Sequence, residues 1–141
     1  MQRTVERMLR TNPEPPFAPA DPLSACIYAC VECAQACTAC ADACVAEHER
    51  ALGRCIRLNL DCADLCTAAS HVLSRQFAPD LGVVRMTLQL CAAVCDACTF
   101  ECSQHAADHA HCDVCAAACR RCTNACRALL ATKVEPHRFQ H

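Results

Sequence analysis

The 141-residue sequence contains no tryptophan, a single tyrosine and only two glycines. β-Branched residues are also few, which disfavours a sheet, whereas the abundant Ala, Leu, Arg, Glu and Gln favour helices. We therefore predict an all-α fold. The length and the 54% share of hydrophobic residues suit one domain with one core rather than two full-sized domains.

The sequence also lacks an excess of charge. Its 13 Lys and Arg residues and 15 Asp and Glu residues give a formal net charge of −2 and are dispersed along the chain. This distribution argues against a nucleic-acid partner and against a polybasic membrane-binding surface. We also expect no transmembrane helix, because charged residues should interrupt the apolar stretches before they reach the roughly 18 residues that span a bilayer.

Targeting and catalytic motifs are not recognisable. The first 25 residues carry Arg3, Arg7 and Arg10 but no apolar core of a signal peptide, and they continue into a proline-rich stretch. We therefore expect a cytoplasmic protein in a reducing compartment, where thiols remain free to bind metal. No nucleophile–base pair, nucleotide-binding loop or HExxH motif is found, so an enzyme is not expected.

The prolines lie mainly near the two ends of the chain and separate them from a helical middle. In the N-terminal segment, a short amphipathic turn around Val5, Met8 and Leu9 precedes prolines that forbid regular helix. We expect this leader to pack outside the helical middle of the chain. The predicted segments are the leader (1–20), a four-helix bundle (21–134) and a tail (135–141).

Capping signals and breaks in the cysteine spacing divide the middle segment into four helices. Asp21 and Pro22 predict the first start, as an N-cap acceptor followed by a proline at the first helical position. Gly53 marks the expected turn into the second helix, Asp80 the N-cap of the third, and Pro136 the end of the fourth. Short connections predict antiparallel neighbours, hence an up-down four-helix bundle. The predicted helices span about residues 21–48, 53–78, 80–107 and 108–132.

Eighteen cysteines recur at intervals of three and four residues within the predicted helices. The average interval of 3.5 residues faces the axis of a left-handed bundle, so we predict that all four helices direct cysteine into the core. The second helix has fewer cysteines. Asn59, Ala69 and Leu73 occupy the remaining positions of its three- and four-residue spacing, which we call the cysteine frame. The predicted thiolate ligands are Cys26, Cys30, Cys33, Cys37, Cys40, Cys44, Cys55, Cys62, Cys66, Cys91, Cys95, Cys98, Cys102, Cys112, Cys115, Cys119, Cys122 and Cys126.

Two structural explanations fit this pattern less well than metal binding. Cysteine can pack a core as a small hydrophobe, but Leu, Ile or Val at the same positions would bury more apolar area. A disulfide framework is disfavoured because neighbours three or four residues apart on one helix are poorly oriented for the bridge and because the compartment is expected to be reducing.

The kind of metal follows from softness, geometry and charge. Thiolates select Cu(I), zinc or iron–sulfur clusters, and nothing in the spacing sets apart the few cysteines of a discrete cluster. Zinc prefers separate four-ligand sites, and four thiolates leave each site with two net negative charges that are costly to bury repeatedly. Cu(I) binds between two or three thiolates, and one ion per cysteine keeps the core neutral because each ion replaces a thiol proton. We therefore predict multiple Cu(I) ions, on the order of 18. A zinc thiolate buffer and a thiol-based redox or detoxification enzyme remain as alternatives.

The two ends of the predicted bundle differ chemically. Glu47 and His48 close the first helix at a polar end, near which the frame of the second helix places Asn59. The opposite end is an apolar plug of Leu23, Leu73, Val84, Leu88 and Leu129. Residues expected at the surface or in general packing are His71, His137, His141, Met8 and Met86.

Three histidines at the polar end are candidate ligands that would pass Cu(I) from solvent to the first thiolates. His105 and His109 continue the cysteine frame and are stronger candidates than His111, which precedes Cys112. Surface histidines at helix ends are the alternative interpretation. Asn59 is expected either to bind copper weakly or to hydrogen-bond within the core.

The cysteine runs resemble those of the cytosolic branch of the bacterial copper storage proteins, a family of cysteine-rich four-helix bundle copper-binding proteins. The resemblance covers residues 21–132 and rests on the CxxxCxxCxxxCxxCxxxC run from Cys26 to Cys44 and on the runs Cys91 to Cys102 and Cys112 to Cys126. It implies Cu(I) held by thiolates, histidines near an open mouth, and a homotetramer. A copper chaperone is the expected exchange partner.

Overall fold

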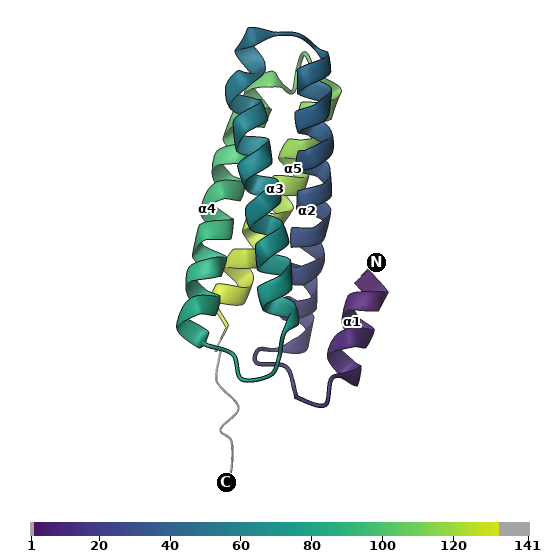
Figure 1. Ribbon diagram of the computed structural model, residues 1–141, viewed down its shortest axis with the longest axis vertical. Coiled ribbons are helices and arrows are strands. Elements are labelled where there is room, and N and C mark those ends of the chain that lie inside the picture. The colour runs from purple at the N-terminus through teal and green to yellow at the C-terminus, as the bar shows by residue number, and fades with distance from the viewer. Residues whose placement is uncertain (1, 133–141) are drawn as a thin grey trace.

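A computed structural model of the protein describes residues 2–132, which form helices joined by short connections (Figure 1). No strand occurs in this part of the chain, which confirms the predicted all-α class. The predicted stop at Pro136, and also His137 and His141, lie outside the described residues. The elements are α1 (Gln2–Thr11), α2 (Ala20–Ala46), the 3-10 helix η1 (Arg50–Leu52), α3 (Gly53–Ser74), α4 (Leu81–His105) and α5 (Ala110–Leu130).

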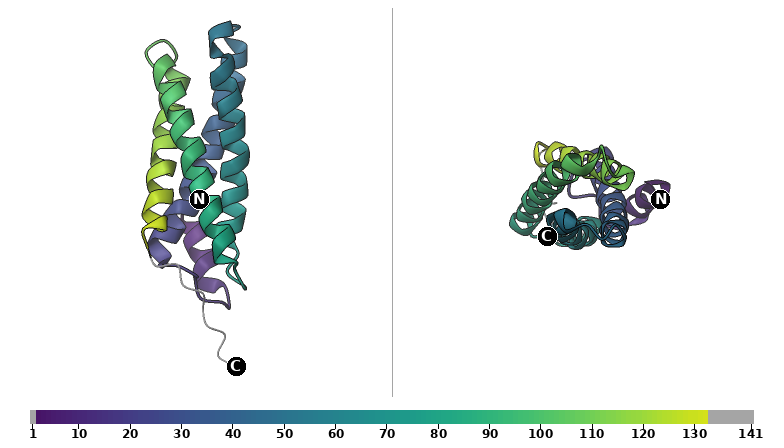
Figure 2. Two further views of the ribbon diagram at one scale, coloured as in Figure 1. Left: turned by 90° about the vertical axis from the view of Figure 1, so that its left-hand side faces the viewer. Right: turned by 90° about the horizontal axis from the view of Figure 1, so that it is seen from above.

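Helices α2 to α5 form a four-helix bundle. Both α2 and α4 pack against α3 and against α5, so the four helices surround a common axis, as the view along that axis shows (Figure 2). Successive helices run in opposite directions. The α2–α3 and α4–α5 connections therefore share one end, which we call the mouth, and the α3–α4 connection lies at the other, which we call the closed end (Figure 1).

The leader forms a 10-residue helix, α1, rather than the short turn expected from its sequence. The helix continues to Thr11 because the first proline is Pro13 and the intervening Arg, Glu, Gln and Leu residues favour helix. It lies against the outside of α2 near the closed end, where Leu9 is buried (Figure 1). Phe17 then anchors the following segment: its side chain is buried, and its N–H donates to Gln76 Oε1 at 3.1 Å.

The start of α2 differs from the prediction. Asp21 is not the N-cap, because the helix begins at Ala20 after Pro19, whose φ of −52° and ψ of 132° provide the extended backbone that precedes it. Asp21 instead lies in the first turn, and the N-cap position makes no side-chain hydrogen bond. Asp80 does cap α4 as expected, since its Oδ1 accepts a hydrogen bond from the Val83 N–H at 3.0 Å.

The turn from α2 to α3 is also made differently. Gly53 was expected to make it, but its backbone is helical and it begins α3. The left-handed conformation is adopted by His48, with φ of 56°, which follows Glu47, the C-cap residue of α2. We expected glycine at this turn because glycine adopts positive φ most easily. The residue with positive φ is instead a histidine.

Two helices, α2 and α4, are long and apolar enough to cross a membrane by length and composition alone. Charged residues do interrupt both helices, as expected, for example Glu32 in α2 and Asp96 in α4. They do not lower the mean hydropathy enough to exclude a span by this test. In the bundle these helices direct their cysteines toward the axis, which explains much of their hydropathy, and helices buried in the core of a folded domain pass the same test. The most apolar window of α4 is only 33% buried.

Candidate metal-binding core

The bundle axis is lined with sulfur. All 18 cysteines are free thiols, and none exposes more than 2% of its surface. The shortest Sγ–Sγ distance described is 3.4 Å, between Cys55 and Cys102, whereas a disulfide bond is about 2.05 Å long. A metal–thiolate bond of about 2.3 Å allows one ion to lie between sulfurs at such separations. The core is thus arranged for shared metal ions.

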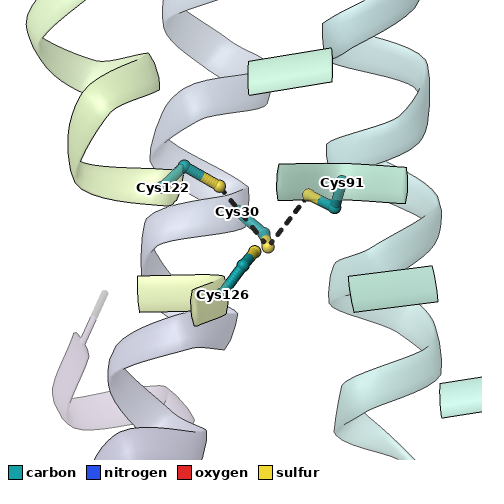
Figure 3. Close-up of side chains that lie close together, drawn as sticks. All are labelled: Cys30, Cys91, Cys122 and Cys126. Carbon is teal, nitrogen blue, oxygen red and sulfur yellow. Dashed lines mark hydrogen bonds between the residues drawn. The ribbon is translucent and has the colours of Figure 1, made fainter. Parts of the chain in front are cut away.

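Thiols from different helices meet across the axis. Cys30 of α2 lies 3.9 Å from Cys91 of α4 and 3.8 Å from Cys122 of α5, measured between Sγ atoms. Figure 3 shows these side chains and Cys126 pointing toward one another. The four sulfurs lie within 4.8 Å of one another and form one of several such groups.

The groups share members and so form a continuous network. Cys33 Sγ, near the middle of the bundle, lies between 3.7 and 3.9 Å from the sulfurs of Cys37, Cys62, Cys95 and Cys119. The sulfur atoms of cysteines four residues apart on one helix are also close, as in Cys62 and Cys66, whose Sγ atoms are 3.8 Å apart. Because Cys33 belongs to two of the four-thiol groups, those groups cannot all hold separate tetrahedral ions.

Asn59 is fully buried among the thiols. Its Oδ1 accepts hydrogen bonds from Cys98 at 3.0 Å, Cys115 at 3.1 Å and Cys102 at 3.5 Å. Its Nδ2 donates to Cys55 Sγ at 3.6 Å. Of the two roles expected for this residue, the structure shows hydrogen bonding within the core.

The thiols differ in proton affinity. A hydrogen bond with Cys126 lowers the pKa of Cys26 to about 5, and a hydrogen bond with Cys102 lowers that of Cys40 to about 6. Burial raises the pKa of Cys44 and of Cys112 because the charged thiolate loses its hydration. Metal binding will release the protons that these thiols carry.

The closed end is apolar, as its sequence indicates. Its five plug residues are almost or fully inaccessible: Leu23, Leu73, Leu88 and Leu129 at 0% and Val84 at 2% exposure. The mouth is less polar than expected, because Leu52 of η1 is also fully buried there.

The histidines at the mouth do not rank as the cysteine frame suggested. His111 contacts the thiols, with Nδ1 3.5 Å from Cys40 Sγ and 3.6 Å from Cys112 Sγ. His105 and His109 instead face carboxylates. The reason is that α4 ends at His105 and His109 is the N-cap residue of α5, so the helical frame does not continue through them.

Carboxylates pair with all three histidines. Glu47 Oε1 lies 3.2 Å from His111 Nε2 and 3.4 Å from His109 Nδ1, and Glu49 Oε2 lies 3.2 Å from His109 Nε2. Sequence reasoning placed Glu47 at this end but missed Glu49, whose position depends on the turn after α2.

Glu101 was also missed. It is 7% exposed and its Oε1 lies 3.2 Å from His105 Nε2. The four-residue spacing of these two residues on α4 was the available signal, because side chains at i and i+4 are neighbours on a helix. The residues left outside the predicted site behave as expected, since Met8, Met86 and His71 are exposed.

The family model and the solved structures that match this chain all belong to one family. The family model for copper storage protein (Csp) matches residues 20–131. The copper storage protein Ccsp of Streptomyces lividans, solved with 10 copper equivalents, is 49% identical over 92% of this chain and 99% of that one, with a TM-score of 0.86. A structure of a cytosolic copper storage protein from the same organism with five coppers is 54% identical over 79% of this chain and 93% of that one, with a TM-score of 0.75.

A more distant structure is that of apo copper storage protein 3 from Bacillus subtilis. It is 38% identical over 76% of this chain and 97% of that one, with a TM-score of 0.65. The search of curated proteins found no match. The matched region contains all four bundle helices and every cysteine, and the chain belongs to the copper storage protein family.

Proposed function

We propose that this protein stores multiple Cu(I) ions in the cytosol on thiolates inside its four-helix bundle. The observation that carries the proposal is the continuous network of 18 buried, free thiols. Its sulfurs are spaced for an ion that binds two or three thiolates, and they share partners as bridged Cu(I) sites require. The related Streptomyces lividans structure with 10 copper equivalents supports the same use.

Charge balance supports Cu(I) as the main cargo. Each Cu(I) ion that displaces one thiol proton leaves the core neutral, so many ions can accumulate without burying net charge. We propose that all 18 cysteines take part, with a capacity on the order of 18 ions. A bound ion array uses the thiols as ligands and leaves no open position for a substrate, which supports storage rather than catalysis.

We further propose that copper enters at the mouth through His105, His109 and His111. Their side chains are between 10% and 25% exposed, so they contact both solvent and the end of the core. Asn59 lies between the first thiols and the middle of the network, where it can bind copper weakly as ions pass. A copper chaperone that meets the mouth is the proposed exchange partner.

The protein is also proposed to form a homo-oligomer, a tetramer by family resemblance. Support comes from α4, whose outer face exposes Val83, Met86, Leu90 and Phe100 by 53% to 70%. An exposed apolar stripe of this kind marks an interaction surface. Arg85 precedes Leu90 by five residues and Asp96 follows it by six, so antiparallel pairing of two copies would place Arg85 near Asp96 of the partner subunit.

Anaerobic titration of the reduced protein with Cu(I) tests the storage function. With bathocuproine disulfonate as a competing chelator, we expect many Cu(I) ions, on the order of 18 per chain, to remain bound. Protein whose thiols have been alkylated is the control and should retain none. Retention of a few zinc ions but of no Cu(I) would support the zinc buffer instead, and turnover with peroxide would support the enzyme.

A further inference from the structure

Four donor atoms at the mouth form a nearly regular tetrahedron. They are the sulfurs of Cys40, Cys44 and Cys112 and Nδ1 of His111, contributed by α2 and α5. The three S–S edges are 3.9, 4.0 and 3.9 Å, and the three S–N edges are 3.5, 3.9 and 3.6 Å. All six edges of the tetrahedron are thus closely similar in length.

The size of this tetrahedron matches one metal. Zinc binds thiolate at about 2.3 Å and imidazole at about 2.0 to 2.1 Å, which for ideal tetrahedral angles gives S–S edges of about 3.8 Å and S–N edges of about 3.6 Å. The observed edges differ from these by a few tenths of an ångström at most. Three cysteines and one histidine are also a common ligand set of structural zinc sites.

The surroundings fix the histidine in the orientation that such a site needs. Glu47 Oε1 lies 3.2 Å from His111 Nε2, so a neutral ring donates its proton there and keeps the Nδ1 lone pair toward the three thiols. A carboxylate that orients a metal-binding histidine in this way is typical of zinc proteins.

The charge argument against zinc in the core is weaker at the mouth. Three thiolates and a neutral imidazole around Zn²⁺ leave one net negative charge, whereas an all-thiolate site leaves two. The His111 side chain is 25% exposed, so water screens the remaining charge. The all-thiol groups, such as the one that contains Cys30, are buried throughout.

We propose that Cys40, Cys44, His111 and Cys112 bind one Zn²⁺ ion in the copper-free protein, so that the chain has a divalent-metal site at the mouth besides its Cu(I) core. The proposal goes beyond copper storage and does not depend on it, because zinc binding is measured without copper. It also gives Glu47 a role as a positioning residue for His111.

Competition experiments on the reduced, copper-free protein test the site. With pyridylazoresorcinol as a chromophoric chelator, the unmodified chain should retain one zinc ion per chain. His111→Ala and Cys112→Ala should each weaken zinc binding by about 100-fold or more, and Glu47→Ala by about 10-fold to 100-fold. Glu49→Ala is the matched control, because Glu49 lies at the same helix end but pairs with His109, and it should leave the zinc affinity unchanged.

Co²⁺ substitution gives a second readout that does not depend on the variants. One Co²⁺ ion per chain should produce the ligand-field and thiolate charge-transfer bands of a tetrahedral site, and His111→Ala should change them while far-ultraviolet circular dichroism stays unchanged. The proposal is overturned if no zinc is retained, if zinc binds equally well without His111, or if several zinc ions bind with equal affinity. Cu(I) retention is measured separately, so failure here leaves the storage proposal intact.

Discussion

The amide of Asn59 lies fully buried among the thiols of the core. Because it accepts hydrogen bonds from three S–H groups, it organises the protons of the metal-free core near the mouth. When those cysteines bind metal they become thiolates and can no longer donate. Asn59 therefore matters for stability mainly in the empty protein.

Asn59→Ala should consequently have different effects on the two forms. In the metal-free protein it leaves buried thiols without their acceptor and should lower the free energy of unfolding by about 1 to 3 kcal/mol. In the copper-loaded protein the loss should be clearly smaller. Urea unfolding of both forms measures this, with the exposed Asn124→Ala as a control. An equal loss in both forms would contradict the interpretation.

The buried thiols also predict a pH dependence. Burial raises the pKa of Cys112 above its ordinary value near 9, so the neutral thiol contributes stability that is fully present below that pH and is lost as the pH rises toward the raised pKa. The free energy of unfolding of metal-free Cys112→Ala should therefore decrease less steeply above about pH 9 than that of the unmodified protein. Parallel curves would show that this thiol is not responsible.

The histidines at the mouth should affect rates more than capacity. Replacing both His105 and His109 with Ala should slow copper loading and removal, while the number of ions retained at equilibrium changes little, because the thiols remain. Stopped-flow measurement of Cu(I) transfer from bathocuproine disulfonate checks this, with the exposed His71→Ala as the control. Unchanged rates would contradict this entrance.

At the scale of single elements, the α4 N-terminus has a defined cap and the α2 N-terminus does not. Asp80 accepts a hydrogen bond from the Val83 N–H, whereas Asp21 lies inside the first turn of α2. Both are aspartates that sequence reasoning treated as equivalent start signals. The helix starts two residues earlier than predicted, with Pro19 at the N-cap position, so Asp21 has no capping role.

Two matched substitutions should separate these positions. Asp80→Ala should lower the free energy of unfolding by about 1 kcal/mol through loss of the cap. Asp21→Ala should cost less, because it removes only a favourable charge near the helix N-terminus, worth about 0.3 to 1 kcal/mol at low ionic strength. Thermal or urea unfolding of the metal-free protein measures both. A larger effect at Asp21 would contradict the assignment of the helix start.

The same elements show what sequence can and cannot predict. The intervals of three and four residues predicted the burial of every cysteine, because one helical period fixes which face points to the axis. The contacts of His109 and Glu49 were not predicted, because they depend on the connections at the mouth. The spacing of residues within a helix does not predict the conformation of the loops between helices. His48, with its positive φ, is an example of a local conformation that only the structure shows.

At the scale of the whole molecule, α4 links the core to the surface. One of its faces supplies buried thiols and the opposite face is apolar and exposed. Large apolar side chains that gather on one exposed face are typical of an interaction surface, so the outer face of α4 is the proposed contact between copies.

Leu90→Glu should therefore shift the protein toward smaller assemblies. It places a charge at the centre of the α4 stripe, where desolvation in an interface is costly. Size-exclusion chromatography with light scattering measures the mass, and Val114→Glu, at a similarly exposed valine of α5, is the control. Equal masses for the unmodified protein and Leu90→Glu would place the contact elsewhere.

The fully buried leucines of the closed end have a consequence for how fast the protein can work. If ions pass only through the mouth, capacity grows with the length of the bundle, whereas flow depends on a single cross-section at one end. A longer bundle of the same design would hold more copper without filling any faster. The rate of copper transfer and the number of ions held are thus separate properties. Substitutions at a few residues of the mouth can change the rate without changing the number of ions.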